Sequence, residues 1–181
     1  MKTEMYTKID QSTSHKKSRV SVANFALKKE QNLAHLVEMA FDVQHEYHVK
    51  AFWCLELVCE KKLKTFIPYF SDFFSVLATI KDDSSKRPAA KICMFLAKSN
   101  HRKNGITLNK EQEHIIIEVS LDRLIGNEKV AAKYYSIKAL FVLGKKYPWV
   151  HETIKPILIE DAIKHSAAYQ AVARQVLKKI K

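Results

Sequence analysis

The sequence predicts an all-α protein, an α–α superhelix of about four helical hairpins with about nine helices in total. Two observations lead to this prediction. Only three glycines and four prolines occur in 181 residues, too few for the many tight turns that a β-sandwich or an α/β protein of this size needs. Apolar residues recur at helical spacing between short polar stretches, and those stretches contain residues that cap helices.

Each predicted helix has a local start signal or an apolar face. The nine helices are expected to begin at about residues 14, 32, 47, 63, 85, 109, 128, 148 and 166. The third is apolar on nearly all sides, so we expect it to be buried between neighbours. Pro68 either kinks the fourth helix or opens a new first turn, and Pro88 is expected in the first turn of the fifth.

Start and stop signals are clearest in the second half of the chain. Asn109 is followed by acidic residues that suit the positive end of a helix, and Gly126 is a good residue to end it. Asn127 and Ser166 are predicted caps of the seventh and ninth helices. Residues 1–13 are polar, so we expect a flexible N-terminal segment followed by a single helical-repeat domain over residues 14–181.

Four segments of similar build recur along the chain. Each has a basic or amide residue followed by small and apolar residues, and the segments are placed by Lys50, Arg87, Lys133 and Gln170. The intervals are 37, 46 and 37 residues, and a polar stretch at residues 100–108 accounts for the longer one. This period is typical of two-helix solenoid repeats.

Three of these stretches also resemble a known family. Residues 85–93 (SKRPAAKIC), 128–136 (EKVAAKYYS) and 165–169 (HSAAY) are similar to segments of short bacterial HEAT-like proteins. The resemblance covers the chain from about residue 14 to the end and implies a stack of HEAT-like hairpins. Members of that family often carry the label "adenylosuccinate lyase", but the resemblance implies no agreed activity and no functional residues.

The sequence lacks the residues that two enzyme interpretations of this resemblance require. True adenylosuccinate lyases resemble long helical bundles with a Gly-Ser-Ser-x-Met-Pro-x-Lys-x-Asn loop. Residues 84–88 (SSKRP) lack its Gly, Met and Asn, so we do not expect lyase activity. HEAT-like DNA glycosylases are an analogy of fold alone. The predicted fifth, seventh and ninth helices contain no Asp, which leaves Glu128 at their edges and Glu56 and Glu60 on the third.

The composition argues against metal, membrane and secretory roles. Cys54, Cys59 and Cys93 lie in apolar helical stretches without a C-x-x-C pair, as expected of buried reduced thiols in the cytoplasm. No apolar stretch reaches membrane-spanning length, and the first residues lack a signal-peptide core. His45 and His48 are three residues apart, but we interpret them as part of a polar turn and expect no metal.

The charge distribution is the most informative feature. Lys and Arg outnumber Asp and Glu by 31 to 19, a net charge of +12. Residues 84–110 contain seven basic residues and residues 164–181 contain five, and neither range contains an acid. In HEAT-like stacks the second helix of each pair lines the concave face. Six basic residues are expected along that face: Lys50, Arg87, Lys91, Lys129, Lys133 and Arg174.

We therefore expect a cytoplasmic, non-catalytic binding module that uses no cofactor. Cations on successive repeats can follow a phosphate backbone, so the expected partner is nucleic acid or an acidic protein. A protein–protein scaffold that uses the same concave face is the main alternative. An enzyme that acts on nucleic acid or a nucleotide is the third interpretation, although no catalytic residue can be named.

Overall fold

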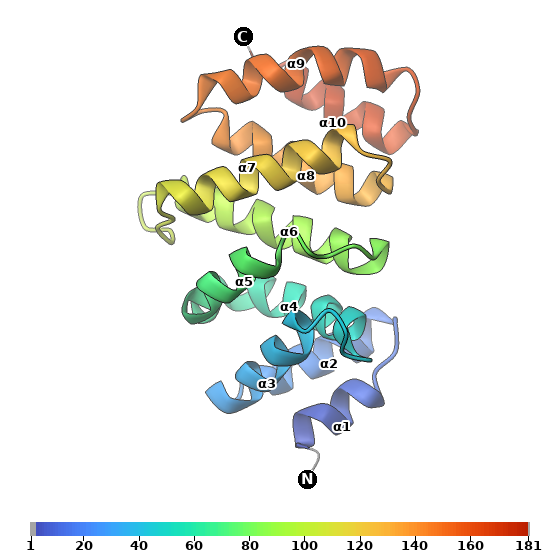
Figure 1. Cartoon of the computed structure of the whole chain (residues 1–181), viewed down its shortest axis with the longest axis vertical. Helices are drawn as coiled ribbons and strands as arrows, with labels where there is room; N and C mark the ends of the chain where they lie inside the picture. The colour runs from blue at the N-terminus through green and yellow to red at the C-terminus, as the bar shows by residue number, and fades with distance from the viewer. Residues whose placement is uncertain (1–2, 181) are drawn as a thin grey trace. The chain divides into compact units, whose positions relative to one another are not determined.

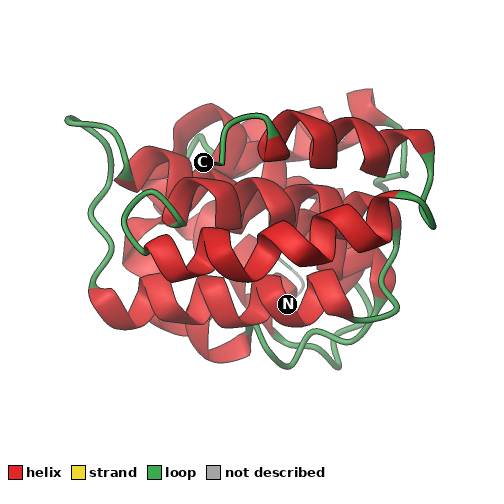
Figure 2. Ribbon diagram, turned by 90° about the horizontal axis from the view of Figure 1, so that it is seen from above, coloured by secondary structure: helices red, strands yellow, loops and turns green. Residues whose placement is uncertain are grey.

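A computed structural model describes residues 3–180 and confirms the all-α class, because helices and loops account for this whole range and no strand occurs in it. Figures 1 and 2 show this arrangement. The elements are α1 (Glu4–Asp10), α2 (Lys16–Ala26), α3 (Glu30–Phe41), α4 (His48–Lys62), the 3-10 helix η1 (Leu63–Tyr69), α5 (Phe70–Val76), α6 (Asp83–Asn100), α7 (Lys110–Ile125), α8 (Val130–Leu143), α9 (Pro148–Ala162) and α10 (Ala167–Leu177).

The helices divide into two compact units, with the boundary between Ala89 and Ala90 inside α6. Unit 1 comprises the chain up to Ala89, and unit 2 begins at Ala90. This division falls within residues 14–181, the range for which the sequence predicts one repeat domain. Each unit is described by itself.

In unit 1, helices that alternate along the chain lie next to each other. α2 packs against both α3 and α4, and α3 packs against α4 and α5. The ammonium group of Lys61 on α4 donates a hydrogen bond to Asn24 Oδ1 on α2 at 2.5 Å, across an interval of 37 residues. That interval equals the shorter spacing of the sequence repeats. The apolar residues of α4 are buried as predicted, with Phe52, Leu55 and Val58 all 0% exposed.

Residues 1–13 are expected to be a flexible segment, and within them the structure has a short helix, α1. Thr3 caps this helix by accepting a hydrogen bond from the backbone N–H of Tyr6. Met5 and Ile9, one turn apart, are both 0% exposed, and α1 packs against α2 and α3. One pair of apolar residues is too short a pattern to show helical periodicity in the sequence, but it buries enough surface to dock a two-turn helix.

Pro68 interrupts the predicted fourth helix. Residues 63–69 form a 3-10 helix that contains this proline, and α5 begins at Phe70. Proline has no N–H to donate within an α-helix, so the tighter 3-10 turn is the local solution. The interruption lets Phe66 and Phe73 pack edge to face at 5.4 Å between ring centroids, beside Phe41.

Unit 2 shows the two-layer arrangement that a stack of hairpins requires. α7 packs against α8, and α9 packs against α10. α8 also lies against α10, and α7 against α9. Each hairpin therefore contributes one helix to each layer. The ammonium group of Lys138 on α8 donates to Gln175 Oε1 on α10 at 3.2 Å, again across 37 residues.

The helix-end predictions in unit 2 have mixed outcomes. Asn109 caps α7 in a reciprocal capping box with Gln112, as its side chain predicts. Gly126 ends that helix with a φ of −69°, so its backbone is not left-handed. Lys129, not Asn127, is the N-cap residue of α8, and the side chain of Ser166 makes no cap hydrogen bond at α10. Pro88 lies inside α6, beyond its first turn.

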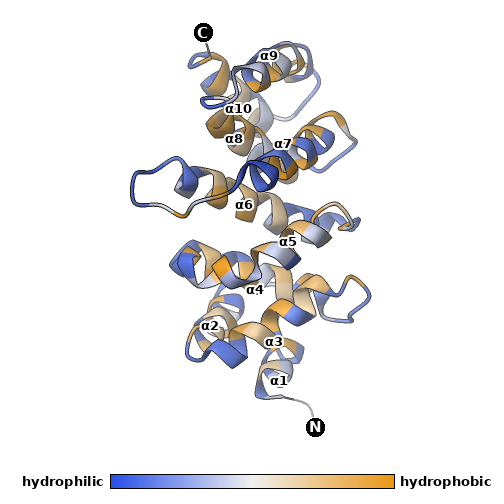
Figure 3. Ribbon diagram, turned by 60° about the vertical axis from the view of Figure 1, so that its left-hand side comes forward, coloured by the Kyte–Doolittle hydropathy of each residue, from blue (hydrophilic) through white to orange (hydrophobic). Residues whose placement is uncertain are grey.

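In each unit the hydrophobic residues are found mainly on the packed helices (Figure 3). The connection between α6 and α7 is mostly hydrophilic, while the helices carry the hydrophobic residues that form the cores. The three cysteines are buried and unpaired, as the sequence predicts. Burial raises the pKa of the Cys54 and Cys93 thiols to about 12, so these groups stay protonated at neutral pH.

Candidate anion-binding surface

Charge is unequally shared between the two units. Unit 1 contains 14 Lys and Arg against 11 Asp and Glu, a net charge of +3. Unit 2 contains 17 against 8, a net charge of +9. Most of the excess positive charge of the chain therefore belongs to the second unit.

Within unit 2 the charges also separate by layer. α8, α10 and residues 90–100 of α6 contain no acidic residue at all. The acids of α7 and α9 are Glu111, Glu113, Glu118, Asp122, Glu152, Glu160 and Asp161. Seven of the eight acidic residues of the unit thus belong to α7 and α9, and the eighth, Glu128, lies just before α8.

A small pocket lies on this acid-free layer. Its volume is about 130 Å³, and three lysines from different parts of the chain line it: Lys98 of α6, Lys138 of α8 and Lys179 just after α10. The other lining residues are Gln175, Phe141, Val142 and Val176. The pocket thus combines three ammonium groups and one amide with an apolar wall.

Lys98 lies close to other positive charges. The pKa of Lys98 is lowered by partial burial and by the nearby positive charges of Lys138 and Arg102. Lys98 is in the last turn of α6, where a cation is favourable to the helix dipole, so its presence there has a structural explanation. Lys138 is in the middle of α8, and its ammonium group donates to Gln175 Oε1 of α10. An anion in the pocket would reduce this repulsion.

Aromatic rings alternate with these cations along the same helices. The Lys91 ammonium group lies 5.4 Å from the centroid of Phe95 and 6.0 Å from that of Tyr135. The Lys138 ammonium group lies 5.1 Å from the ring of Tyr134. These three rings are partly exposed, so they combine cation–π contacts with faces that could stack on flat ligands.

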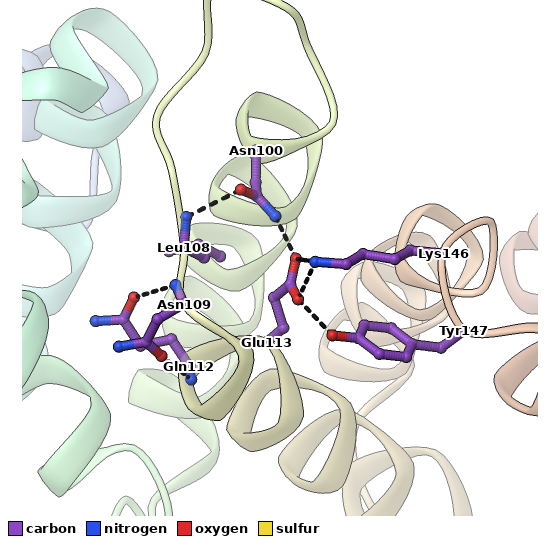
Figure 4. Close-up of polar contacts among 7 residues, drawn as sticks. All are labelled: Asn100, Leu108, Asn109, Gln112, Glu113, Lys146 and Tyr147. Carbon is purple, nitrogen blue, oxygen red and sulfur yellow. Dashed lines mark hydrogen bonds and ion pairs between the residues drawn. The ribbon is translucent and has the colours of Figure 1, made fainter.

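A buried carboxylate of α7 binds the end of α6 and the α8–α9 connection (Figure 4). Glu113 of α7 is 0% exposed and accepts hydrogen bonds from Asn100 Nδ2 at 2.6 Å, Lys146 Nζ at 2.6 Å and the Tyr147 hydroxyl at 2.5 Å. Burial raises the pKa of this carboxyl, but the three hydrogen bonds outweigh it, and the pKa is lowered overall. Glu113 is therefore a charged structural centre that joins the end of α6 to the α8–α9 connection.

The loop itself is fixed at several backbone points. Asn100 Oδ1 accepts the N–H of Leu108 at 2.9 Å, and Ser99 Oγ accepts the N–H of Ile106 at 3.1 Å. A Cβ atom at Gly105 would lie 1.6 Å from the Ser99 carbonyl oxygen, so only glycine fits there. These contacts fix the course of the α6–α7 connection.

Three of the six predicted site residues belong to α6, α8 and α10 or their ends. Lys91 is on α6 and contacts a ring of α8. Arg174 is exposed on α10, and its Nε donates to the Gln170 carbonyl at 3.3 Å. Lys129 is exposed at the start of α8.

Lys133 is expected in the row of exposed cations, but the structure places it in the interior. Its side chain is buried, with 4% of the residue exposed, and the ammonium group donates to the Leu124 carbonyl at 2.8 Å. That carbonyl belongs to the last turn of α7, where backbone oxygens have no partner within the helix. Lys133 therefore completes the end of α7 and is not displayed for a partner.

The remaining two predicted residues belong to unit 1 and make internal contacts. Lys50 donates its ammonium group to the Asp10 carbonyl at 2.8 Å. Arg87 forms an ion pair with Glu56 at 2.9 Å, and Glu56 is only 3% exposed. This pairing also occupies one of the two carboxylates that the sequence offered for excision chemistry.

Sequence reasoning missed the residues that form the pocket. Lys98 is seven positions after Lys91, which places both on one side of α6. Lys138 and Gln175 are separated by the same 37 residues as Lys133 and Gln170. The repeat spacing therefore contained the signal, but the repeated positions Lys50, Arg87, Lys133 and Gln170 do not line the pocket.

The histidine considered for metal binding and the serines considered for lyase chemistry make contacts within the fold. His48 is buried, and its Nδ1 lies 2.7 Å from the Ala40 carbonyl. Among residues 3–180, no three His, Cys, Asp or Glu side chains are grouped as a metal site. Ser85 is 0% exposed, and the Ser84 carbonyl accepts a hydrogen bond from the Trp53 indole at 3.1 Å.

No family model, no curated protein and no solved structure matches this chain. In the part of the chain that the structure describes, no helix is long and apolar enough to span a bilayer.

Proposed function

We propose that this chain is a non-catalytic binding module for nucleic acid, and that α6, α8 and α10 of unit 2 form its binding surface. The observation that supports this most strongly is the pocket of Lys98, Lys138 and Lys179 on a layer without acidic residues. Cations that repel one another gain most from a polyanion, because each phosphate contact releases condensed counterions.

The aromatic rings favour nucleic acid over an acidic protein. An acidic protein needs only opposite charge, whereas nucleic acid also offers flat bases. Phe95, Tyr134 and Tyr135 are partly exposed beside Lys91 and Lys138. Stacking on such rings contributes about 1–3 kcal/mol per base in single-strand binding. We therefore expect single strands to bind more tightly than duplexes.

The proposal extends to the repeat type and the compartment. The 37-residue interval between contacting positions supports a HEAT-like hairpin repeat, and it occurs within each unit. Three buried unpaired thiols favour a reducing compartment such as the cytoplasm.

Fluorescence anisotropy with labelled oligonucleotides tests the proposal. We expect saturable, sequence-independent binding at low salt that weakens steeply as salt rises. Each lost phosphate contact should lower the slope of log affinity against log salt by about 0.7 for a single strand. The double variant Lys98→Glu with Lys138→Glu should lose binding.

The matched control carries the same charge change on the other layer. Lys155 on α9 and Lys164 just after it are exposed, so Lys155→Glu with Lys164→Glu should retain most of the affinity. Circular dichroism would check that both variants remain folded. Equal loss in the two variants would show that total charge alone governs binding. Tighter binding of polyglutamate than of oligonucleotide would favour an acidic protein as the partner.

A further inference from the structure

The pocket between α6, α8 and α10 is sized for one small group. Its volume is about 130 Å³, well below the ~300–1,000 Å³ of pockets that enclose whole drug-sized ligands. A nucleotide cannot enter it entirely, but a phosphate group can. Phe141, Val142 and Val176 form an apolar wall, and such a wall strengthens electrostatic attraction by excluding water.

The charge of the pocket exceeds what one internal phosphate of a strand supplies. Lys98, Lys138 and Lys179 carry three positive charges, and none of the residues that line the pocket is acidic. An internal phosphodiester carries one negative charge. A phosphate monoester carries about two at neutral pH because its second pKa is about 6. The monoester therefore matches the cluster better.

The donors around the pocket also suit the three free oxygens of a monoester. Each lysine offers N–H groups to an oxygen. Gln175 uses its Oε1 to accept from Lys138, which leaves its amide NH₂ as a further donor. A phosphodiester has only two non-bridging oxygens, so it would leave part of this donor set unused.

We propose that this pocket binds the terminal phosphate of a nucleic acid strand in preference to its internal phosphates. This inference rests on the proposed function and specifies which part of the strand the surface recognises. Free phosphate monoesters have the same chemistry, so the adjoining surface must distinguish the two sources.

The adjoining surface favours a strand end over a free monoester. Lys91 and Lys98 are seven residues apart on α6, a distance of about 10 Å along the helix at a rise of 1.5 Å per residue. Tyr134 and Tyr135 lie about one turn before Lys138 on α8. A strand whose end phosphate occupies the pocket can therefore place its next bases over the rings near Lys91.

A comparison of otherwise identical oligonucleotides tests the inference. Short single strands carrying a 5′-phosphate, a 3′-phosphate or only hydroxyl ends would be titrated by anisotropy. We expect one phosphorylated end to bind about tenfold more tightly than the hydroxyl form, the effect of one added charge-assisted contact. Lys138→Gln should reduce this ratio to about one, and the exposed control Lys155→Gln should leave it unchanged.

The outcomes separate this inference from the proposed function. Equal affinity for phosphorylated and hydroxyl strands would overturn the inference while leaving nucleic acid binding intact. A preference that persists in Lys138→Gln would also overturn it, because another site would then read the phosphate. If no strand binds, both proposals fail. Adenosine monophosphate and inorganic phosphate are titrated in parallel, and binding of these as tight as that of the strand end would show that the pocket takes free monoesters.

Discussion

The two predicted site residues of unit 1 and the pocket lysines of unit 2 have different surroundings. In unit 1, Arg87 is paired with buried Glu56 and Lys50 with the Asp10 carbonyl, so these cations stabilise the fold. In unit 2, Lys98, Lys138 and Lys179 converge on a pocket that no acid lines. The comparison teaches that net charge does not locate a binding surface. We propose that a better guide is a cluster of cations whose pocket no acidic residue lines.

The largest expected effect concerns the buried carboxylate that organises unit 2. Glu113→Ala should lower the free energy of unfolding by about 4 kcal/mol, because Asn100, Lys146 and Tyr147 all lose their acceptor. Chemical denaturation measures this. Glu118→Ala on the exposed side of the same helix is the control, and it should change stability by less than about 0.5 kcal/mol. Equal effects would contradict the structural role of Glu113.

The same carboxylate predicts an acid dependence. The pKa of Glu113 is lowered below its ordinary value of 4.5 in the folded protein, so its contribution to stability is complete above that value. The contribution should be lost as pH falls from about 4.5 through the lower folded pKa. Wild type and Glu113→Gln should therefore converge in stability at acidic pH, and a constant difference down to pH 2 would contradict the assignment.

The next effect separates the two units directly. Arg87→Ala removes a partner of buried Glu56 and should lower the free energy of unfolding by about 3 kcal/mol without changing oligonucleotide affinity. Arg174→Ala on exposed α10 should do the reverse, with unchanged stability and weaker binding. Chemical denaturation measures the free energy of unfolding of both variants, and anisotropy measures their oligonucleotide affinities. A binding defect in Arg87→Ala as large as in Arg174→Ala would remove the distinction between units.

A smaller effect is expected at the lysine that the sequence placed on the binding face. Lys133→Met keeps the long side chain but removes the hydrogen bond to the Leu124 carbonyl, so it should lower stability by about 1 kcal/mol. The salt slope of oligonucleotide binding should not change, because this ammonium group is buried. If the variant lowered the salt slope by as much as the loss of one phosphate contact, Lys133 would have to contact the nucleic acid.

The smallest effect is a pH dependence of binding. The pKa of Lys98 is lowered by burial and by the charges of Lys138 and Arg102, and a bound anion should raise it again. Between the two pKa values, binding takes up a proton, so affinity should fall as pH rises toward the ordinary lysine value of 10.5. Titrations at pH 7 to 10 measure this, and Lys98→Met should flatten the profile. If the affinity of the wild type did not change with pH over this range, binding would not be linked to the protonation of Lys98.

Some of this could be read from the sequence because the signals are local. The Asn109 cap, the buried third predicted helix and the effect of Pro68 depend on neighbouring residues alone. Helix α1 was missed because two buried residues make no visible period. The contact partner of each basic side chain could not be predicted from the sequence either. Whether a lysine meets a carbonyl, as Lys133 does, or other lysines, as Lys98 does, depends on helices that only the fold brings together.

Lysine footprinting tests the central claim most directly. Surface amines would be acetylated with and without a saturating single strand, and the modified lysines quantified by mass spectrometry. The account predicts protection of Lys98, Lys138 and Lys179, and unchanged reactivity of Lys155 and Lys164 on the other layer of unit 2. Protection of the α9 layer, or equal protection of lysines in both units, would contradict it.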